Sequence, residues 1–168
     1  MSLRRVVNVV GLLQVFVALS MFAAAGVSLL YAESETIGIL GSAPITFFVG
    51  GAVYRLTIFE GDITLREGFA MVTLAWTATA AFGALPYLLT GALDSPIAAF
   101  LEAMSGFTTT GATVFSDVES LSHGILFWRS LTQWLGGMGI IVLVIAILPF
   151  LGGRRDAALQ GGGARADA

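Results

Sequence analysis

The stretch SGFTTTGAT, residues 105–113, joins two long apolar parts of the chain. The residues just before it fit a short helix, because Ser95 is a good N-cap and Pro96 a good first helical residue. Helical residues 96–107 would rise about 18 Å, roughly half the thickness of a bilayer. A helix of that length cannot cross a membrane. In a membrane protein we therefore expect it to enter the bilayer and to return through the polar segment TTTGAT.

The composition predicts an integral membrane protein. Hydrophobic residues make up 57% of the 168 residues, charged residues make up 11%, and the mean hydropathy is +0.90. A soluble domain carries about 25% charged residues. A soluble fold of this chain would therefore lack the polar surface needed to cover it.

Several classes of function and site are excluded. The chain has no cysteine and a single histidine, which rules out disulfides, thiolate metal sites and histidine clusters. A pI of 4.9 argues against a nucleic-acid partner. No nucleotide-binding loop, catalytic triad or metal-ligand cluster is recognisable. We therefore expect neither an enzyme nor a bound cofactor.

Four uncharged apolar segments, 6–32, 37–54, 68–93 and 130–153, approach or exceed the ~20 residues that a spanning helix needs. With four spans, seven of the eight arginines fall on one side of the membrane, and the loops on the other side carry only acidic charges. Because short cytoplasmic loops retain positive charge, both termini are expected in the cytoplasm.

The expected fold class is an all-α integral membrane protein, with four transmembrane helices plus one re-entrant pore helix and filter loop. The chain would divide into a helix pair at 1–55, a cytoplasmic loop at 56–66, a helix–pore loop–helix unit at 67–153 and a tail at 154–168. The Gly/Ala-rich composition of the tail predicts that it is flexible.

The TTTGAT segment suits a monovalent cation. The C-terminal end of the half-length helix points into the membrane and has a partial negative charge. An extended Thr-Thr-Gly segment can turn successive carbonyls toward an ion, and Gly111 has the freedom of φ that this requires. The absence of a carboxylate in the segment fits a monovalent ion better than calcium or magnesium. From composition alone, close packing of membrane helices also explains these small and hydroxylated residues.

FLEAMSGFTTTGAT, followed by FWRSLTQWLGGMGIIVLVIAILPFLG, closely resembles the TrkH branch of the Trk/Ktr/HKT potassium transporter superfamily. The resemblance runs from the first helix to Gly153. It implies that four repeats of helix, pore loop and helix surround one pore, with two extra helices in front. Residues 1–55 would be the extra pair and 67–153 the first repeat. It also implies potassium transport across a bacterial inner membrane, a homodimer of complete chains and a cytosolic, nucleotide-binding TrkA-type partner.

The resemblance assigns the selectivity filter residue by residue. The potassium-channel filter reads T-V-G-Y-G, and its places fall on Thr109, Thr110, Gly111, Ala112 and Thr113. Thr109 would offer a carbonyl and a hydroxyl at the inner end, and the next three residues would offer carbonyls. Thr108, just before them, is expected to support the filter, together with Glu102 and Arg129.

The sequence departs from the family in one respect, because the family has four pore loops per chain and this sequence has one. A single loop cannot encircle an ion. Either the chain is a piece of a longer transporter or four copies assemble, and the asymmetric repeats of the family favour the first interpretation. A non-conducting membrane scaffold or accessory subunit is the alternative function.

Glu102 and Arg129 are expected at similar depths in the membrane. A charge there costs about 2.5–3.5 kcal/mol on insertion scales and normally finds a partner. We therefore predict that Arg129 pairs with Glu102, directly or through the filter backbone, and supports the loop without contacting the ion. The alternative is that Arg129 extends alone to the outer surface.

Other residues have structural interpretations. Pro86 predicts a kink in the third helix, and Gly136, Gly137 and Gly139 predict a close approach to the pore helix.

Three polar or aromatic residues are expected at the two membrane surfaces. Glu67 should lie in the solvated cytoplasmic loop with Glu60 and Asp62, and His123 should be an interfacial or capping residue at the outer start of the fourth helix. Trp128 fits an interfacial anchor or a packing residue equally well.

Overall fold

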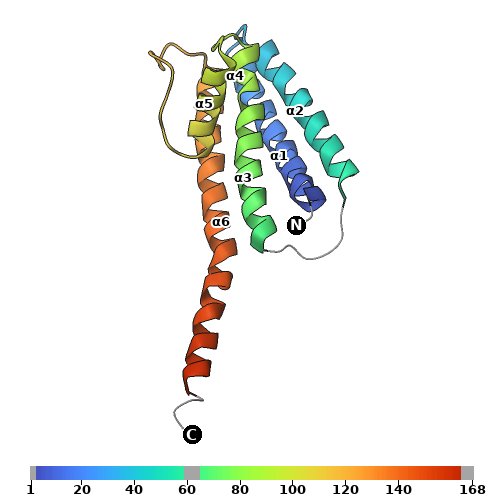
Figure 1. Ribbon diagram of the computed structural model, residues 1–168. Helices are drawn as coiled ribbons and strands as arrows, with labels where there is room; N and C mark the ends of the chain where they lie inside the picture. The colour runs from blue at the N-terminus through green and yellow to red at the C-terminus, as the bar shows by residue number, and fades with distance from the viewer. Residues whose placement is uncertain (1–2, 59–64, 164–168) are drawn as a thin grey trace.

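Every element of the described chain is a helix. The computed structural model describes residues 3–58 and 65–163 (Figure 1). Its elements are α1 (Leu3–Leu30), α2 (Thr36–Leu56), α3 (Leu65–Gly83), α4 (Leu85–Leu89), α5 (Pro96–Phe107) and α6 (His123–Gly163). The all-helical class predicted from the sequence is confirmed for these residues.

Three stretches of the described residues are long and apolar enough to cross a membrane: Leu3–Leu30, Thr36–Leu56 and Glu67–Leu89. Large apolar side chains such as Phe16 and Phe48 are exposed along α1 and α2, as expected for helices that face lipid. The fourth predicted span lies in α6, and the structure describes only part of the side chains of that helix.

The helix that contains the third span is interrupted near Pro86, as predicted. α3 ends at Gly83 and α4 begins at Leu85, with Pro86 in the first turn of α4. Proline has no backbone N–H and its ring clashes with the preceding turn, which accounts for the break between α3 and α4.

Residues 154–163 are helical, where a flexible tail was expected from position 154 onward, and α6 continues to Gly163. Glycine disfavours a helix by about 1 kcal/mol per residue, but Gly152 and Gly153 are followed by Arg, Ala, Leu and Gln, which are good helix formers. The local sequence therefore supports continuation of the helix. The remainder of the predicted tail, 164–168, lies outside the described residues.

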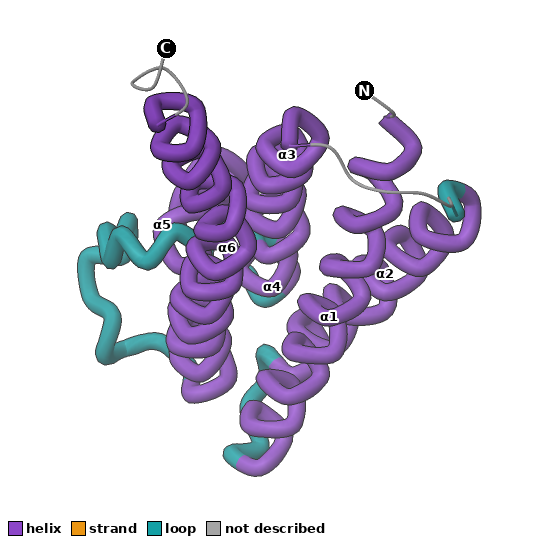
Figure 2. Tube along the Cα trace, turned by 90° about the horizontal axis from the view of Figure 1, so that it is seen from below, coloured by secondary structure: helices purple, strands orange, loops and turns teal. Residues whose placement is uncertain are grey.

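α1 and α2 form an antiparallel pair whose backbones approach closely. A Cβ on Gly11 would lie 2.9 Å from the Gly50 carbonyl, and one on Gly50 would lie 2.7 Å from Cβ of Gln14. Seen from below, α1 lies between α2 and the other helices (Figure 2). In the same view the long connection from α5 to α6 lies on the opposite side of the molecule from α2.

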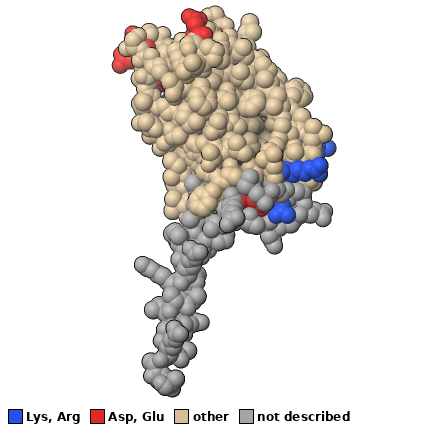
Figure 3. All heavy atoms as spheres, viewed as in Figure 1, with Lys and Arg blue, Asp and Glu red and all other residues tan. Residues whose placement is uncertain are grey.

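Charges separate toward the two ends of the helices (Figure 3). Arg4, Arg5 and Arg55 lie where α1 begins and α2 ends. The acidic residues of the α1–α2, α4–α5 and α5–α6 connections lie toward the other end, namely Glu33, Glu35, Asp94, Asp117 and Glu119.

Glu67 is an exception to the prediction of a solvated loop. It lies in the first turn of α3, is only 2% exposed, and pairs with Arg5 of α1 at 3.4 Å. The arginine compensates the buried carboxylate, which is why burial is tolerated there. Glu60 and Asp62 lie outside the described residues.

Candidate functional site

The helix α5 leads directly into the TTTGAT segment, residues 108–113, and so determines where this segment begins. Ser95 caps the helix, because its backbone is extended and its hydroxyl accepts a hydrogen bond from the Ala98 N–H at 3.4 Å, and Pro96 opens the first turn. The helix ends at Phe107, the end predicted from the sequence. Residues at intervals of three or four along it are buried: Ala99, Glu102, Ala103, Gly106 and Phe107.

The C-terminal end of α5 packs closely against α3 and α6. Gly136 of α6 faces the Phe107 backbone so closely that a Cβ would overlap it. A Cβ on Gly83 would lie 2.6 Å from the Phe107 ring. Trp76 donates its indole N–H to the Phe107 carbonyl at 3.2 Å. The predicted close approach is thus confirmed at Gly136.

The other two glycines for which the sequence predicts a close approach, and the nearby Trp128, have different surroundings. A Cβ on Gly137 would meet Thr109 at 3.8 Å, and one on Gly139 would meet Trp76 at 3.7 Å, both ordinary contact distances. Trp128 is fully buried and donates its indole N–H to the Gly83 carbonyl at 3.0 Å. Of its two predicted roles, packing is therefore the one that the structure supports.

The first half of the TTTGAT segment has an unusual backbone. Thr109 has φ +56° and Gly111 has φ +77°, whereas Thr110 between them has a negative φ. Gly111 thus uses the freedom of φ that was expected of it, and adopts a positive value. Positive φ is rare for a β-branched residue such as threonine and costs of order 1–3 kcal/mol, a strain that concentrates at functional sites.

Hydrogen bonds turn the N–H groups of this half back toward α5. The N–H of Thr109 donates to the Gly106 carbonyl at 2.9 Å, and the N–H of Thr110 donates to the Ser105 carbonyl at 3.0 Å. The Thr108 hydroxyl donates to the Met104 carbonyl at 2.7 Å and lies 2.8 Å from the Thr110 hydroxyl.

Three consecutive carbonyl oxygens in the middle of the segment are left open. Within the described part of the chain, those of Thr109, Thr110 and Gly111 accept no hydrogen bond. All three residues are exposed on the surface of this chain. Three consecutive carbonyls are therefore available to a ligand.

The second half of the segment is held by side chains of α5. The Ala112 carbonyl accepts a hydrogen bond from the Ser105 hydroxyl at 2.6 Å. The Thr113 hydroxyl donates to the Glu102 carboxylate at 3.0 Å. Ala112 therefore has its carbonyl and Thr113 its hydroxyl engaged within the chain. The three residues before them have open carbonyls, although the Thr109 hydroxyl donates to the Thr108 carbonyl at 2.7 Å.

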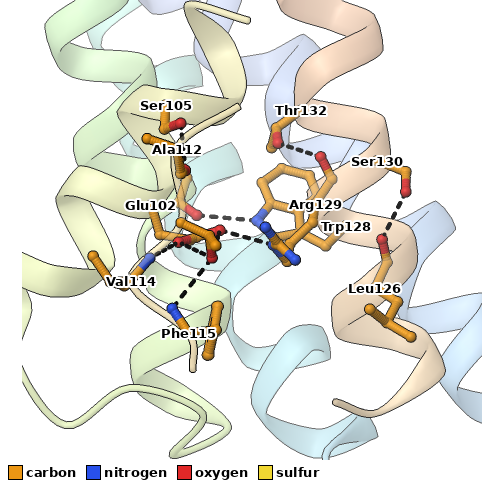
Figure 4. Close-up of polar contacts among 12 residues, drawn as sticks. Glu102, Ser105, Ala112, Val114, Phe115, Leu126, Trp128, Arg129, Ser130 and Thr132 are labelled. Atoms are coloured by element: carbon orange, nitrogen blue, oxygen red, sulfur yellow. Dashed lines mark hydrogen bonds and ion pairs between the residues drawn. The ribbon is translucent and has the colours of Figure 1, made fainter. Parts of the chain in front are cut away.

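Glu102 and Arg129 form the ion pair that the sequence predicts (Figure 4). Arg129 Nε donates to Glu102 Oε1 at 2.8 Å, and the side chains are 15% and 3% exposed, respectively. Arg129 therefore does not extend alone to the surface. Glu102 Oε2 also accepts the N–H of Val114 at 2.9 Å, so one carboxylate joins α6 to the outer end of the TTTGAT segment.

Glu33 has a role that the sequence did not reveal. Its carboxylate accepts hydrogen bonds from the N–H of His123 at 2.6 Å and of Gly124 at 3.0 Å, so it caps the start of α6 from the α1–α2 connection. Burial acts to raise the pKa of Glu33, but these hydrogen bonds and one from the His123 side chain outweigh it and lower the pKa below its ordinary value. No local pattern indicates a cap that lies 90 residues away.

His123 pairs with this cap and does not cap the helix itself. Its Nδ1 lies 2.9 Å from Glu33 Oε1, and its ring stacks on Tyr31 with centroids 3.9 Å apart. The exposed ring, 58% accessible, fits the interfacial position predicted for it.

The chain is similar to known cation transport proteins. Residues 39–163 match the family described as "TrkH: Cation transport protein". The Trk system potassium uptake protein TrkH of Halomonas elongata is 41% identical over 154 residues, and the alignment covers 90% of this chain and 32% of that protein. TrkH of Escherichia coli K12 is 40% identical over 158 residues, with the same two shares.

A more distant relative and a solved structure agree with these matches. The Trk system potassium uptake protein TrkG of Escherichia coli K12 is 36% identical over 151 residues, covering 89% of this chain and 31% of TrkG. The crystal structure of the potassium transporter TrkH from Vibrio parahaemolyticus matches with a TM-score of 0.84 and 38% identity, covering 90% of this chain and 33% of that one. The chain spans about a third of the length of these relatives.

Proposed function

Because the chain belongs to the TrkH family of cation transport proteins, we propose that its TTTGAT segment forms one wall of a potassium-conducting pore. The observation that carries this proposal is the row of three open carbonyls at Thr109, Thr110 and Gly111, directly beyond the C-terminal end of α5. In a potassium filter, rings of backbone carbonyls replace the water shell of the ion, and this row would supply one side of such rings.

The electrostatics of the segment support a monovalent cation. The last carbonyls of α5 contribute a partial negative charge at its C-terminal end. The nearest carboxylate, Glu102, is already paired with Arg129 and bound to Val114 and Thr113. An ion at the open carbonyls would therefore meet dipoles without a free carboxylate, which suits a weakly hydrated ion that has to leave again.

The roles of the predicted filter residues can be refined from these contacts. Thr109, Thr110 and Gly111 are the proposed ligands. Ala112 and Thr113 complete the filter by tying its outer end to Ser105 and Glu102, and Thr108 supports its inner end through Met104 and Thr110.

The proposed setting is a bacterial inner membrane, crossed by α1, α2, α3–α4 and α6, with α5 as a re-entrant helix and both termini in the cytoplasm. The support is the presence of Arg4, Arg5 and Arg55 at one end of the helices and of acidic loops at the other. By resemblance, complete chains would form a homodimer and bind a cytosolic TrkA-type regulator. The remaining walls of the pore would come from further pore repeats.

The competing function is a non-conducting scaffold whose threonines serve only for packing. The left-handed conformation of Thr109 weighs against it, because strain of that kind is not needed for packing. The exposure of the open carbonyls weighs against it too, since packing residues are buried.

Uptake of potassium by the full-length gene product, expressed in a bacterium that lacks its own uptake systems, tests the proposal. We expect growth at low external potassium and uptake of rubidium as a tracer. Protein that is inserted in the membrane at normal levels and yet supports neither would favour the scaffold.

A further inference from the structure

Two aromatic residues connect α4 to the ion pair behind the TTTGAT segment. Tyr87 of α4 is fully buried, and its ring meets the ring of Phe115 edge-on, with centroids 6.1 Å apart. The other neighbour of the Phe115 ring is the guanidinium group of Arg129, whose Cζ lies 5.5 Å from the ring centroid. Tyr87, Phe115 and Arg129 thus form a continuous row from α4 to α6.

Phe115 is also close to the end of the TTTGAT segment along the chain. Its N–H donates to the Thr113 hydroxyl at 3.2 Å, and that hydroxyl donates to Glu102. The residue between them, Val114, donates its N–H to the same carboxylate (Figure 4). A shift of the Phe115 ring would therefore be transmitted both to Arg129 and to the residues that Glu102 holds.

Arg129 depends on such a neighbour for its orientation. The one hydrogen bond that its guanidinium group makes among the described residues runs from Nε to Glu102 Oε1. A single bond fixes the position of a guanidinium group but leaves it free to tilt, whereas an aromatic face holds its plane through a cation–π contact. Phe115 supplies that face, and Tyr87 limits the movement of Phe115.

The Tyr87 hydroxyl takes no part in these contacts. It is buried and has no hydrogen-bond partner among the described residues. It borders a small polar cavity that is also lined by Glu102, Arg129 and Ala112 and has no room for a water molecule. The Thr132 side chain lies beside the hydroxyl but forms no hydrogen bond of ordinary geometry with it, so Tyr87→Phe keeps the ring and tests its role.

We propose that Tyr87 and Phe115 are positioning residues for the TTTGAT segment. They hold the guanidinium group of Arg129 flat against Glu102, and through this carboxylate they set the location of Thr113 and Val114. The consequence for ion selectivity rests on the function proposed above. The positioning of the segment itself does not.

The first test measures hydrogen–deuterium exchange across residues 110–116 of the purified full-length gene product. In Phe115→Leu and Tyr87→Leu, exchange at the Val114 amide should be faster by about two- to thirtyfold, the range expected when a cation–π contact is lost. Tyr87→Phe is the matched control and should exchange like the wild type. Phe115→Met, which removes the ring but keeps most of its volume, serves if a leucine variant does not fold.

The second test measures the preference for potassium over sodium in uptake assays. The preference should fall in the leucine variants and remain in Tyr87→Phe. In an Arg129→Met background, Phe115→Leu should have no further effect on exchange, because residues that act through one contact are not additive.

The possible outcomes separate the two proposals. Unchanged Val114 exchange in Phe115→Leu and Phe115→Met, or a Tyr87→Phe variant as impaired as Tyr87→Leu, would overturn the positioning role. Faster Val114 exchange in the leucine variants would support the positioning role even if the wild-type protein takes up no cation. The absence of uptake by the wild type would overturn only the proposed transport.

Discussion

The Glu33 carboxylate accepts a hydrogen bond from the N–H of Gly124, 91 residues later in the chain, at 3.0 Å. The first N–H groups of a helix have no partner inside the helix, and the partial positive charge at this end favours an anion. Gly124 makes the contact possible, because a Cβ there would lie 2.5 Å from Cβ of Ser28. The α1–α2 pair therefore determines where α6 begins.

Replacing Glu33 by glutamine should lower thermal stability, because the cap loses its charge and one of its two good acceptors. Loss of a helix cap costs about 0.5–2 kcal/mol. Thermal unfolding in detergent measures the effect. Glu35→Gln is the control, since the Glu35 carboxylate accepts a hydrogen bond from the adjacent Ser34 and makes none with the described residues of α6. Equal losses in both variants would contradict the capping role.

The contribution of Glu33 should also depend on pH. Its pKa is lowered in the folded protein, so its stabilisation is fully present above the ordinary pKa of a glutamate and disappears as the pH falls through the folded value. The difference in unfolding temperature between wild type and Glu33→Gln should thus be constant near neutral pH and shrink below about pH 4.3. A difference that grows on acidification would exclude this explanation.

Each single substitution in the Glu102–Arg129 pair should lower the stability more than the double substitution does. Removing one partner leaves a buried charge uncompensated, which costs about 3–5 kcal/mol. Unfolding of Glu102→Gln, Arg129→Gln and the double variant measures the coupling. Independent, additive losses would show that the 2.8 Å contact does not stabilise the protein.

Gly111→Ser should reduce the preference for potassium over sodium, by roughly tenfold if the strain is in the usual range of 1–3 kcal/mol. A Cβ on Gly111 meets nothing within 4 Å, so only its φ of +77° opposes a side chain. Gly91, with φ +73° and equally open surroundings, is the matched control. Gly91→Ser should cost similar stability and leave the preference unchanged, and equal selectivity in both variants would refute the filter assignment.

Gly136→Ala should destabilise the protein by about 1–3 kcal/mol, the usual cost of overpacking, because its Cβ would overlap the Phe107 backbone. Gly137→Ala should be neutral or stabilising, because alanine favours a helix by about 1 kcal/mol over glycine and the new Cβ has ordinary contacts. Thermal unfolding of the two variants measures this difference. Similar losses of stability in both would show that the close contact between Gly136 and Phe107 is not the cause.

The absence of cysteine allows topology to be mapped with single-cysteine variants. Ile58→Cys, beyond the end of α2, should react with a membrane-impermeant maleimide only after the cells are opened. Ser116→Cys, in the α5–α6 connection, should react in intact cells. Labelling of Ile58→Cys from outside would reverse the proposed orientation.

The short helix and the ion pair could be predicted because their signals are local or follow from the cost of an isolated charge. Ser95 and Pro96 mark the start of α5, and only Glu102 and Arg129 were available to compensate each other in the apolar region. The sequence predicts a solvated loop for Glu67 and only an acidic charge in an outer loop for Glu33, because the partners of both residues come from elements distant in sequence.

The backbone of the TTTGAT segment was predictable only in part. Glycine at 111 indicated a positive φ, whereas nothing in a threonine indicates one at 109. The orientation of the Ala112 carbonyl toward Ser105 depends on the path of the chain after the segment, which is set by the contacts of Glu102.

If the three open carbonyls of Thr109, Thr110 and Gly111 bind an ion as proposed, that ion becomes part of the thermodynamics of folding. An unfolded chain does not hold these oxygens together, so an ion that binds them stabilises the folded state by RT ln(1 + [ion]/Kd). The strain at Thr109 is then offset most fully when the site is occupied. The proposed filter would then be a salt-dependent fold, and the ion that it selects would also set the stability of its shape.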